Sequence, residues 1–255
     1  MDWRLKFIYP AVSVTTFLAV WQLVAYRFID PFFLPTPMAI IKGAAELFAD
    51  GSLVMSALAS LARIMSGWLL GSLIAIPVGL AIGTSRILQS IVDPFVHFFR
   101  FIPAIALVTL FIVWFGIGEA SKILLIAYST AFLVVISTAS GVGALSKDKL
   151  DAARCLGASP GQVFFHVVIP ASVPAMYVGM RLSLAASFLV IVAAEMLAAD
   201  SGLGALIWTS RLYFRIDWMF TGIVTLGLLG LAMDRLWKKL GVLLAKRYLR
   251  DALNY

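Results

Sequence analysis

The chain has 255 residues, of which 62% are hydrophobic and 13% charged, and its mean hydropathy is +1.00. A soluble globule of this length needs more polar surface than this composition supplies, so the chain is predicted to lie in lipid. The net charge of +7 would by itself suggest nucleic-acid binding, but the distribution of the charges along the chain does not support that function.

A bilayer-spanning helix needs about 20 apolar residues, because each residue rises about 1.5 Å and the hydrocarbon core is about 30 Å thick. The sequence contains about six such runs, which predict an all-α membrane protein with residues 1–255 in a single transmembrane domain. The runs are Phe7–Tyr26, Leu58–Gly83, Ile91–Phe115, Ile123–Leu145, Ala175–Ala199 and Trp218–Leu240.

The first run has basic residues before it, as a signal peptide does, but it is too long and ends in the bulky Tyr26-Arg27-Phe28. We expect it to be retained. The following segment, Asp30–Ser56, places apolar residues at helical spacing and predicts a short amphipathic helix at the outer surface. The apolar residues are Ile40, Ile41, Ala44, Leu47 and Phe48.

The second and third runs have distinctive small and polar residues. Gly67-xxx-Gly71 and Gly79-xxx-Gly83 in the second predict close helix packing, within the subunit rather than at a dimer seam. The third is interrupted in its first half, so a broken or re-entrant start is expected there. The interrupting residues are Asp93, Pro94, Arg100 and Pro103.

Between the fourth and fifth runs lies a polar insert, Asp151–Pro170, in a loop of about residues 146–172. Ser146 is a candidate N-cap of a short helix, and Gly157 is a candidate left-handed C-terminus for it. Ser159-Pro160 has the N-cap and N1 pattern of a second helix, and Pro170 is expected to stop that helix. The insert is therefore predicted to form a compact helical hairpin outside the membrane, with the small Ala152 and Ala153 allowing close backbone approach.

The positive charges follow the positive-inside rule if both termini are cytoplasmic. Thirteen basic residues then lie inside and five outside, and the polar insert is cytoplasmic. The inside set is Arg4, Lys6, Arg86, Arg100, Lys147, Lys149, Arg154, Arg235, Lys238, Lys239, Lys246, Arg247 and Arg250. The outside set is Arg27, Lys42, Lys122, Arg211 and Arg215. Anionic membrane lipid, and not nucleic acid, is the partner that this distribution favours.

Three ionisable residues stand out inside the second and fifth predicted spans, because charges are costly there. Arg63 and Glu195 are expected at similar depth near the outer ends of the second and fifth helices, which suggests an intramembrane ion pair; separate snorkelling of each is the alternative. Arg181 is expected to snorkel to the cytoplasm. Hydroxyl residues in the spans are candidates for a pathway lining, although such groups usually bond to the preceding helical turn. They are Thr109, Ser129, Thr130, Ser137, Thr138, Ser183 and Ser187.

Catalytic and metal-binding signatures are absent from the sequence. It has no phosphate-binding G-x-x-x-x-G-K-[ST] loop, and His97 and His166 lack Cys or Glu at metal-ligand spacing. Its one cysteine, Cys155, excludes an internal disulfide and is expected to lie buried at a protein interface. A membrane-embedded enzyme is therefore not favoured.

The insert resembles the signature of ATP-binding-cassette (ABC) importer permeases, which is E-A-A, three residues, Gly, nine residues and I-x-L-P. Here it is Asp151-Ala152-Ala153, Gly157 and Val167-x-Ile169-Pro170. Further segments resemble the nitrate/sulfonate/taurine-type permeases. They are Phe33-Leu34-Pro35-Thr36-Pro37, Phe115-Gly116-Ile117-Gly118-Glu119-Ala120-Ser121-Lys122, Ala193-Ala194-Glu195-Met196 and Ser201-Gly202-Leu203-Gly204. The chain departs from these permeases at two positions. Such permeases commonly have Arg-Pro-Ile-Pro followed by a further proline, whereas this chain has Arg100-Phe101-Ile102-Pro103 and then Thr109.

This resemblance implies a type I ABC importer permease in the bacterial inner membrane, with a cytoplasmic coupling helix that docks on separate ATPase subunits. The implied coupling residues are Asp151, Ala152, Ala153, Gly157, Ala158, Ser159, Pro160 and Pro170. The implied partners are two ATPase subunits, which would hold ATP and Mg²⁺, a second permease copy forming a homodimer, and an external or periplasmic substrate-binding protein. No cofactor is expected on this chain, and the implied solute is a small anion.

The alternative is a self-sufficient secondary transporter or channel. Such proteins usually have inverted repeats and midplane ionisable groups, and the sequence indicates neither. This alternative also leaves the helical insert without a role.

Overall fold

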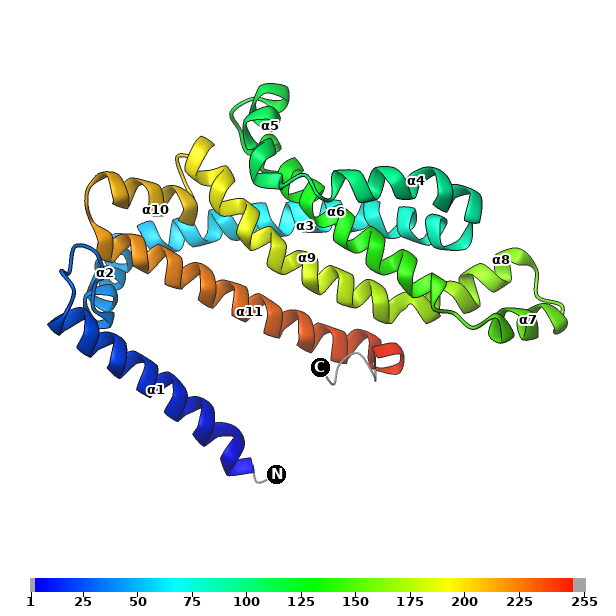
Figure 1. Cartoon of the computed structure of the whole chain (residues 1–255), viewed down its shortest axis with the longest axis horizontal. Helices are drawn as coiled ribbons and strands as arrows, with labels where there is room; N and C mark the ends of the chain where they lie inside the picture. Colours follow the sequence, from blue (N-terminus) through cyan, green and yellow to red (C-terminus); the bar gives the residue numbers. More distant parts are fainter. Residues whose placement is uncertain (1–2, 250–255) are drawn as a thin grey trace.

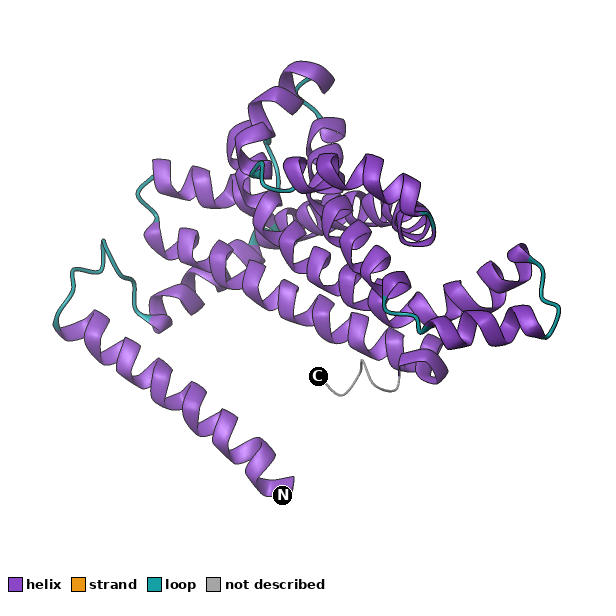
Figure 2. Cartoon of the chain, turned by 45° about the vertical axis from the view of Figure 1, so that its right-hand side comes forward, coloured by secondary structure: helices purple, strands orange, loops and turns teal. Residues whose placement is uncertain are grey.

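The structure is a computed structural model that describes residues 3–249, and every regular element within that range is helical. Five helices are long and apolar enough to cross a membrane, and one bent pair makes a sixth span if its two arms are counted together. The prediction of an all-α membrane protein with about six spans is confirmed. Figures 1 and 2 show the helices as a bundle with one helix, α1, set apart.

In chain order the elements are α1 (Trp3–Arg27), α2 (Pro37–Ala49), α3 (Ser52–Thr84), α4 (Arg86–Phe99), the 3₁₀ turn η1 (Ala104–Leu107), α5 (Val108–Phe115), α6 (Glu119–Gly143), α7 (Lys147–Cys155), α8 (Pro160–Val163), the π turn η2 (Phe164–Val168), α9 (Ile169–Ala198), α10 (Leu203–Leu212) and α11 (Ile216–Leu249). The short helix α2 lies within the predicted amphipathic segment and buries Ile40, Gly43 and Leu47. Residues 8–20 of α1 are all exposed.

The helix α6 packs along both α3 and α9, and these three form the centre of the bundle. The predicted glycine seam joins α3 to α6. A Cβ on Gly71 would lie 2.6 Å from the Ala127 carbonyl oxygen, and one on Gly79 would lie 2.7 Å from Thr138 Cβ. These glycines therefore allow close packing within the subunit, as expected.

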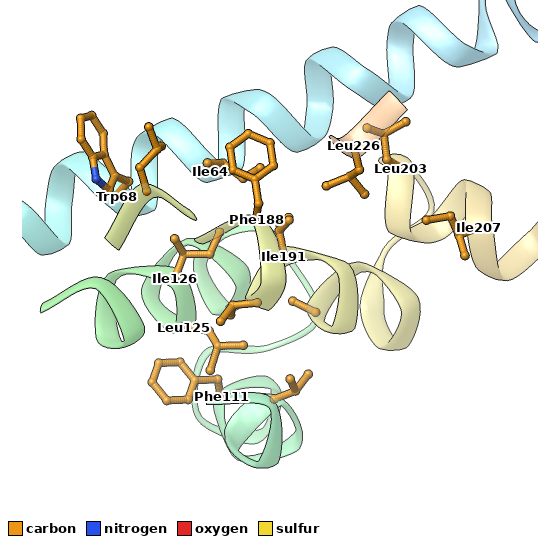
Figure 3. Close-up of a cluster of buried hydrophobic side chains, with 14 residues drawn as sticks. Ile64, Trp68, Phe111, Leu125, Ile126, Phe188, Ile191, Leu203, Ile207 and Leu226 are labelled. Atoms are coloured by element: carbon orange, nitrogen blue, oxygen red, sulfur yellow. The ribbon is translucent and has the colours of Figure 1, made fainter. Parts of the chain in front are cut away.

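The largest buried cluster lies where α3, α5, α6, α9, α10 and α11 converge (Figure 3). Trp68 on α3 packs edge-on against Trp237 on α11, with ring centroids 4.9 Å apart. Trp68 Nε1 also donates to the Met180 carbonyl at 2.9 Å, so the polar atom of this buried ring has a partner. The cluster ties α11 to the central helices. The ends of the bundle differ: α2 and α10 lie at one end, and α7 and α8 at the other (Figure 1).

The third span is broken, as predicted, but at one place only. Pro94 lies inside α4, and the chain bends by 82° between α4 and the arm formed by η1 and α5. The break comprises residues 100–103 and ends at Pro103, the N-cap of η1. Pro94 lies in the middle of α4 and does not end that helix, whereas Ile102, which precedes Pro103, lies outside any helix, as expected for a residue before a proline.

The expectation that Pro170 stops a helix is wrong. Pro170 lies in the first turn of α9, and the chain remains helical from Pro160 to Ala198, a stretch of 39 residues. The π turn η2 ends at Val168, two residues before the proline. An inserted π turn changes the hydrogen-bond register and so accommodates the missing N–H and the bulk of the ring. The fifth span is consequently longer than the predicted Ala175–Ala199, and α10, which follows it, was not predicted.

Candidate functional site

The polar insert forms a helical hairpin of α7 and α8 that projects from one end of the bundle (Figures 1 and 2). Lys147–Cys155 is the first arm, and the second arm begins at Pro160. We call residues 147–163 the coupling hairpin, after the role that the sequence resemblance implies for this segment. The inward side of the coupling hairpin packs on the ends of α3, α6 and α9 through Leu150, Ala153 and Ala158.

Gly157 makes the corner of the coupling hairpin. Its φ is +82°, the left-handed region in which a residue with a Cβ costs about 1–2 kcal/mol. The Gly157 N–H donates to the Arg154 carbonyl at 2.9 Å, and the Ala158 N–H donates to the Ala153 carbonyl at 3.1 Å. These two bonds are the Schellman pattern that ends α7.

The second arm of the hairpin starts with a capping box. Ser159 N–H donates to Gln162 Oε1 at 2.8 Å, and Gln162 N–H donates to Ser159 Oγ at 3.4 Å, with Pro160 at the first helical position. Ser146 occupies the N-cap position of α7, but its side chain makes no capping bond. The local signals in the sequence therefore place both helix starts and the turn correctly, whereas the predicted capping by the Ser146 hydroxyl is wrong, as is the stop at Pro170.

The outward side of the coupling hairpin is open. Asp151, Ala152, Ser159 and Pro160 are exposed, and Leu156 at the tip is 88% exposed. Cys155 is also exposed in this chain, so the interface expected to bury its thiol is not within the subunit.

At the opposite end of the bundle, the structure brings Arg63 and Glu195 together. Arg63 Nη1 donates to Glu195 Oε1 at 2.7 Å, and the Glu195 side chain is fully buried. Arg63 also binds Glu119 with two bonds, Nε to Oε2 at 2.6 Å and Nη2 to Oε1 at 2.8 Å. The arginine thus binds two carboxylates, whereas the sequence predicted only one.

The Glu195 carboxylate also fixes the start of α10. It accepts bonds from the Gly204 N–H at 2.8 Å and from the Ser60 hydroxyl, and Ser60 Oγ accepts the Leu203 N–H at 2.8 Å. A carboxylate at a helix N-terminus satisfies backbone donors and is stabilised by the helix dipole. Close approach here requires glycine, because a Cβ on Gly202, whose φ is +114°, would overlap the Glu195 carboxylate.

Three of the sequence segments with a family resemblance therefore meet at one buried cluster. Glu119 comes from Phe115–Lys122, Glu195 from Ala193–Met196, and the α10 start from Ser201–Gly204, whose Ser201 carbonyl accepts from Arg63 Nη1 at 2.6 Å. We call Ser60, Arg63, Glu119, Glu195 and Ser201 the arginine cluster. Glu119 was missed as a member because it stands at the start of a span, where an acidic residue is also an ordinary helix-start residue.

Arg181 does not snorkel alone. It makes a bidentate ion pair with Asp234 on α11, with Nε to Oδ1 at 2.6 Å and Nη2 to Oδ2 at 2.8 Å. Asp234 lies within the predicted sixth span and carries no sequence signal of its partner. The pair joins α9 to α11 and compensates both charges.

Most hydroxyl candidates for a pathway lie in helix contacts. Thr130, Thr138, Ser183 and Ser187 are fully buried, and Thr130 Oγ1 lies 3.2 Å from Ser187 Oγ in the seam between α6 and α9. Ser183 and Ser187 donate to carbonyls of the preceding turn. The other three candidates, Thr109, Ser129 and Ser137, are less buried, and Ser129 lines a cavity at the break in the third span.

Comparison with known proteins places this architecture in a family. Residues 52–241 match the family described as the binding-protein-dependent transport system inner membrane component. A probable ABC transporter permease of Brucella melitensis is 42% identical over 203 residues, covering 80% of this chain and 82% of that protein. The taurine transport system permease protein TauC of Escherichia coli is 34% identical over 245 residues, covering 91% and 89%.

Among solved structures, the MetNI methionine ABC transporter in an inward-facing conformation has a chain that superposes with a TM-score of 0.67. That chain is 20% identical, and the match covers 79% of this protein and 96% of the MetNI chain. The fold is that of a type I ABC importer permease. Other relatives are named as aliphatic sulfonate and nitrate permeases. On the helical bundle, the coupling hairpin and these matches, the chain belongs to the binding-protein-dependent inner-membrane components, the permease subunits of ABC importers.

Proposed function

We propose that this chain is a permease subunit that imports a small anion by alternating access, driven by separate ATPase subunits. The subunit acts as a homodimer with two ATPases and receives its solute from an external binding protein. Both termini are cytoplasmic. The anion is of the taurine, sulfonate or nitrate class, for which several relatives are named.

The coupling hairpin is the observation that carries this proposal. Its corner is fixed by the Schellman bonds of Gly157 and by the capping box of Ser159, so a force on Leu156 does not merely bend a flexible loop. Helix α8 continues through η2 into α9 without a break. Displacement of the hairpin by an ATPase therefore moves a 39-residue rod.

That rod ends at the arginine cluster. Glu195 stands in the last turn of α9, about 35 residues and about 50 Å of helix from Pro160. The cluster ties the end of α9 to α3, α6 and α10 through side-chain bonds. A packed rod held at both ends transmits a shift as a rigid-body motion, which is the change that alternating access needs.

The test is copurification from the native membrane in mild detergent, followed by vanadate-sensitive ATP hydrolysis and ATP-driven solute uptake by the recovered complex. Gly157→Val is the test variant, because a β-branched residue is incompatible with the left-handed corner. Gly161→Val in the same hairpin is the matched control, since Gly161 has no positive φ and nothing lies within 4 Å of an added Cβ.

We expect the wild type and Gly161→Val to recover stoichiometric ATPase, and Gly157→Val to lose it while its own melting temperature stays near that of the wild type. A wild-type chain that purifies alone and transports solute into liposomes without ATP would contradict the proposal. Normal ATP-driven uptake by Gly157→Val would contradict the role of the corner.

A further inference from the structure

A cavity of about 500 Å³ lies at the break in the third span. Its wall is formed by residues 100–105 of the break, by α6 and by α9, and Arg100, Tyr128, Ser129 and Ala186 are among the lining residues. Its size falls in the range of about 300–1,000 Å³ that is typical of small-molecule sites.

The cavity lies at membrane depth. Tyr128 Oη donates to the Phe99 carbonyl at 2.8 Å, so Arg100 stands beside Tyr128 of α6. Tyr128 is in the middle part of this 25-residue helix, about 14 Å from its start and about 22 Å from its end. The positive-inside pattern placed Arg100 at the cytoplasmic surface, whereas the structure places it beside the middle of α6.

Irregular backbone at such depth does not face lipid, because lipid offers no hydrogen-bond partners. Residues 100–103 are irregular, and Phe101 is 74% exposed in the single subunit. Their surroundings must therefore be protein or water. A water-containing path beside a second copy of the chain meets that requirement.

Arg100 differs from the other basic side chains on the central helices. Arg63, Lys122 and Arg181 each contact a carboxylate. Among residues 8–243, whose side chains the structure describes, no ion pair includes Arg100, and its guanidinium lies 4.7 Å from the Phe101 ring centroid. An intramembrane cation without an internal counter-ion is by default a functional residue.

The two hydroxyl side chains of the lining already donate within the protein. The Tyr128 hydroxyl gives its proton to the Phe99 carbonyl, and the Ser129 hydroxyl gives its proton to the Ile126 carbonyl at 3.0 Å. The guanidinium has five N–H donors in a planar fork that suits sulfonate, carboxylate or nitrate oxygens. Recognition in this cavity therefore selects for negative charge.

We propose that Arg100 binds the transported anion within the translocation path. This inference rests on the proposed importer function and adds the residue that receives the solute inside the membrane. Because the external binding protein sets the apparent affinity, loss of Arg100 lowers the maximal uptake rate and leaves KM nearly unchanged.

The experiment uses the permease reconstituted in proteoliposomes with its ATPase and binding protein, with radiolabelled taurine and nitrate as the two probe anions. Arg100→Gln and Arg100→Lys are compared with Arg211→Gln. Arg211 is the matched control, because it too is exposed and lies 5.0 Å from an aromatic centroid, that of Trp208, but belongs to α10 and not to the cavity.

Hydrogen bonds to charged groups contribute about 1.5–3 kcal/mol, so we expect a fall of about tenfold to a hundredfold in the maximal uptake rate of Arg100→Gln. ATP hydrolysis and complex assembly remain, Arg100→Lys recovers part of the rate, and Arg211→Gln is unaffected. Arg100→Gln with full uptake of both anions would overturn the inference. So would a wild-type complex that hydrolyses ATP and imports neither anion, although the importer assignment would then stand.

A second readout separates solute from lipid phosphate as the partner of Arg100. In a Cys155→Ser background, we expect Arg100→Cys to react with a water-soluble cationic methanethiosulfonate and to regain uptake when the cation is attached. The anionic reagent should not restore uptake. Arg100→Cys that is unreactive toward both reagents would place the residue against lipid and overturn the inference, while uptake by the wild type would still support the importer function.

Discussion

Arg63 Nη1 lies 2.7 Å from Glu195 Oε1, although the two residues stand 132 positions apart in the chain. The contact is not an isolated pair, because the same arginine binds Glu119 with two further bonds and the same glutamate binds the start of α10. A charge swap between the two residues is therefore a poor test. An arginine at position 195 would meet Gly202 and Gly204, which already contact the glutamate closely.

Neutral substitutions in the arginine cluster should be unequally destabilising. Arg63→Gln leaves the fully buried Glu195 charge without its cation and should cost about 3–5 kcal/mol. Glu195→Gln should cost less, because Arg63 retains Glu119, and Glu119→Gln should cost least, because its side chain is 57% exposed. Melting temperatures of the detergent-solubilised variants give the order. Equal losses for Arg63→Gln and Glu119→Gln would contradict this description of the cluster.

The glycine that faces Glu195 should be far less replaceable than another glycine with a positive φ. Gly202→Ala introduces both an unfavourable backbone conformation and an overlap with the Glu195 carboxylate. Gly116→Ala is the control, since its φ is +80° and nothing lies within 4 Å of an added Cβ. Gly116→Ala should cost about 1–3 kcal/mol, because its φ of +80° with ψ of 172° is a conformation that essentially only glycine adopts. Gly202→Ala should cost clearly more, measured as thermal stability in detergent. Similar costs would show that the overlap is relieved by movement of α10.

The Arg181 and Asp234 pair should tolerate exchange. Its side chains are 31% and 39% exposed, so its net contribution should be modest, about 1 kcal/mol. Arg181→Ala and Asp234→Ala should each loosen α11, and Arg181→Asp combined with Asp234→Arg should restore stability. A double-mutant cycle measures this coupling, and a coupling of zero would mean that the two charges act independently. Unlike Glu195, neither residue has a glycine backbone pressed against it.

The contact between α2 and α11 should weaken in acid. Glu46 Oε2 accepts from Arg215 Nη2 at 2.6 Å and from Trp218 Nε1 at 3.0 Å. The hydrogen bond from Arg215, with that from Trp218, lowers the pKa of Glu46 below its ordinary 4.5. A depressed carboxyl pKa stabilises the fold above the unfolded-state value, and this stability is lost as the pH falls from about 4.5 through the lower folded-state pKa. The effect is measured as the hydrogen-exchange protection of the α2 amides, at pH values about one unit apart from about pH 6 to about pH 3. Glu46→Gln should remove the loss of α2 protection in acid that Glu46 causes. If the protection of α2 in this variant depends on pH as in the wild type, another titratable group is responsible.

The single cysteine offers a test of orientation. Cys155 is exposed on the coupling hairpin, which should lie in the cytoplasm. A membrane-impermeant maleimide should label inside-out vesicles and not right-side-out vesicles, and bound ATPase should slow the labelling. Cys155→Ser controls for other reactive groups. Labelling from the outside would invert the proposed topology.

The membrane spans and the corner of the coupling hairpin can be predicted from the local sequence. Runs of about 20 apolar residues identify the spans, because a bilayer leaves a hydrophobic helix as the only available state for them. The corner of the coupling hairpin is equally local, because Gly157 and the Ser159-Pro160 pair act within one turn of helix. Pro170 shows the limit of such rules. A π turn upstream allows the helix to continue, and nothing in the pattern of residues indicates that turn.

Only the tertiary structure decided the full set of charges that meet. The sequence supplied Arg63 and Glu195 as partners by depth, but depth does not indicate which faces of α3, α6 and α9 oppose each other, so Glu119 and Asp234 could not be assigned. The depth of a residue along a broken span depends on the bend, which is 82° here. For this reason Arg100 lies beside the middle of α6 and not at the membrane surface where the sequence placed it. Apolar length fixes which segments enter the membrane, whereas helix rotation and bending fix which side chains touch, and these depend on packing between distant segments.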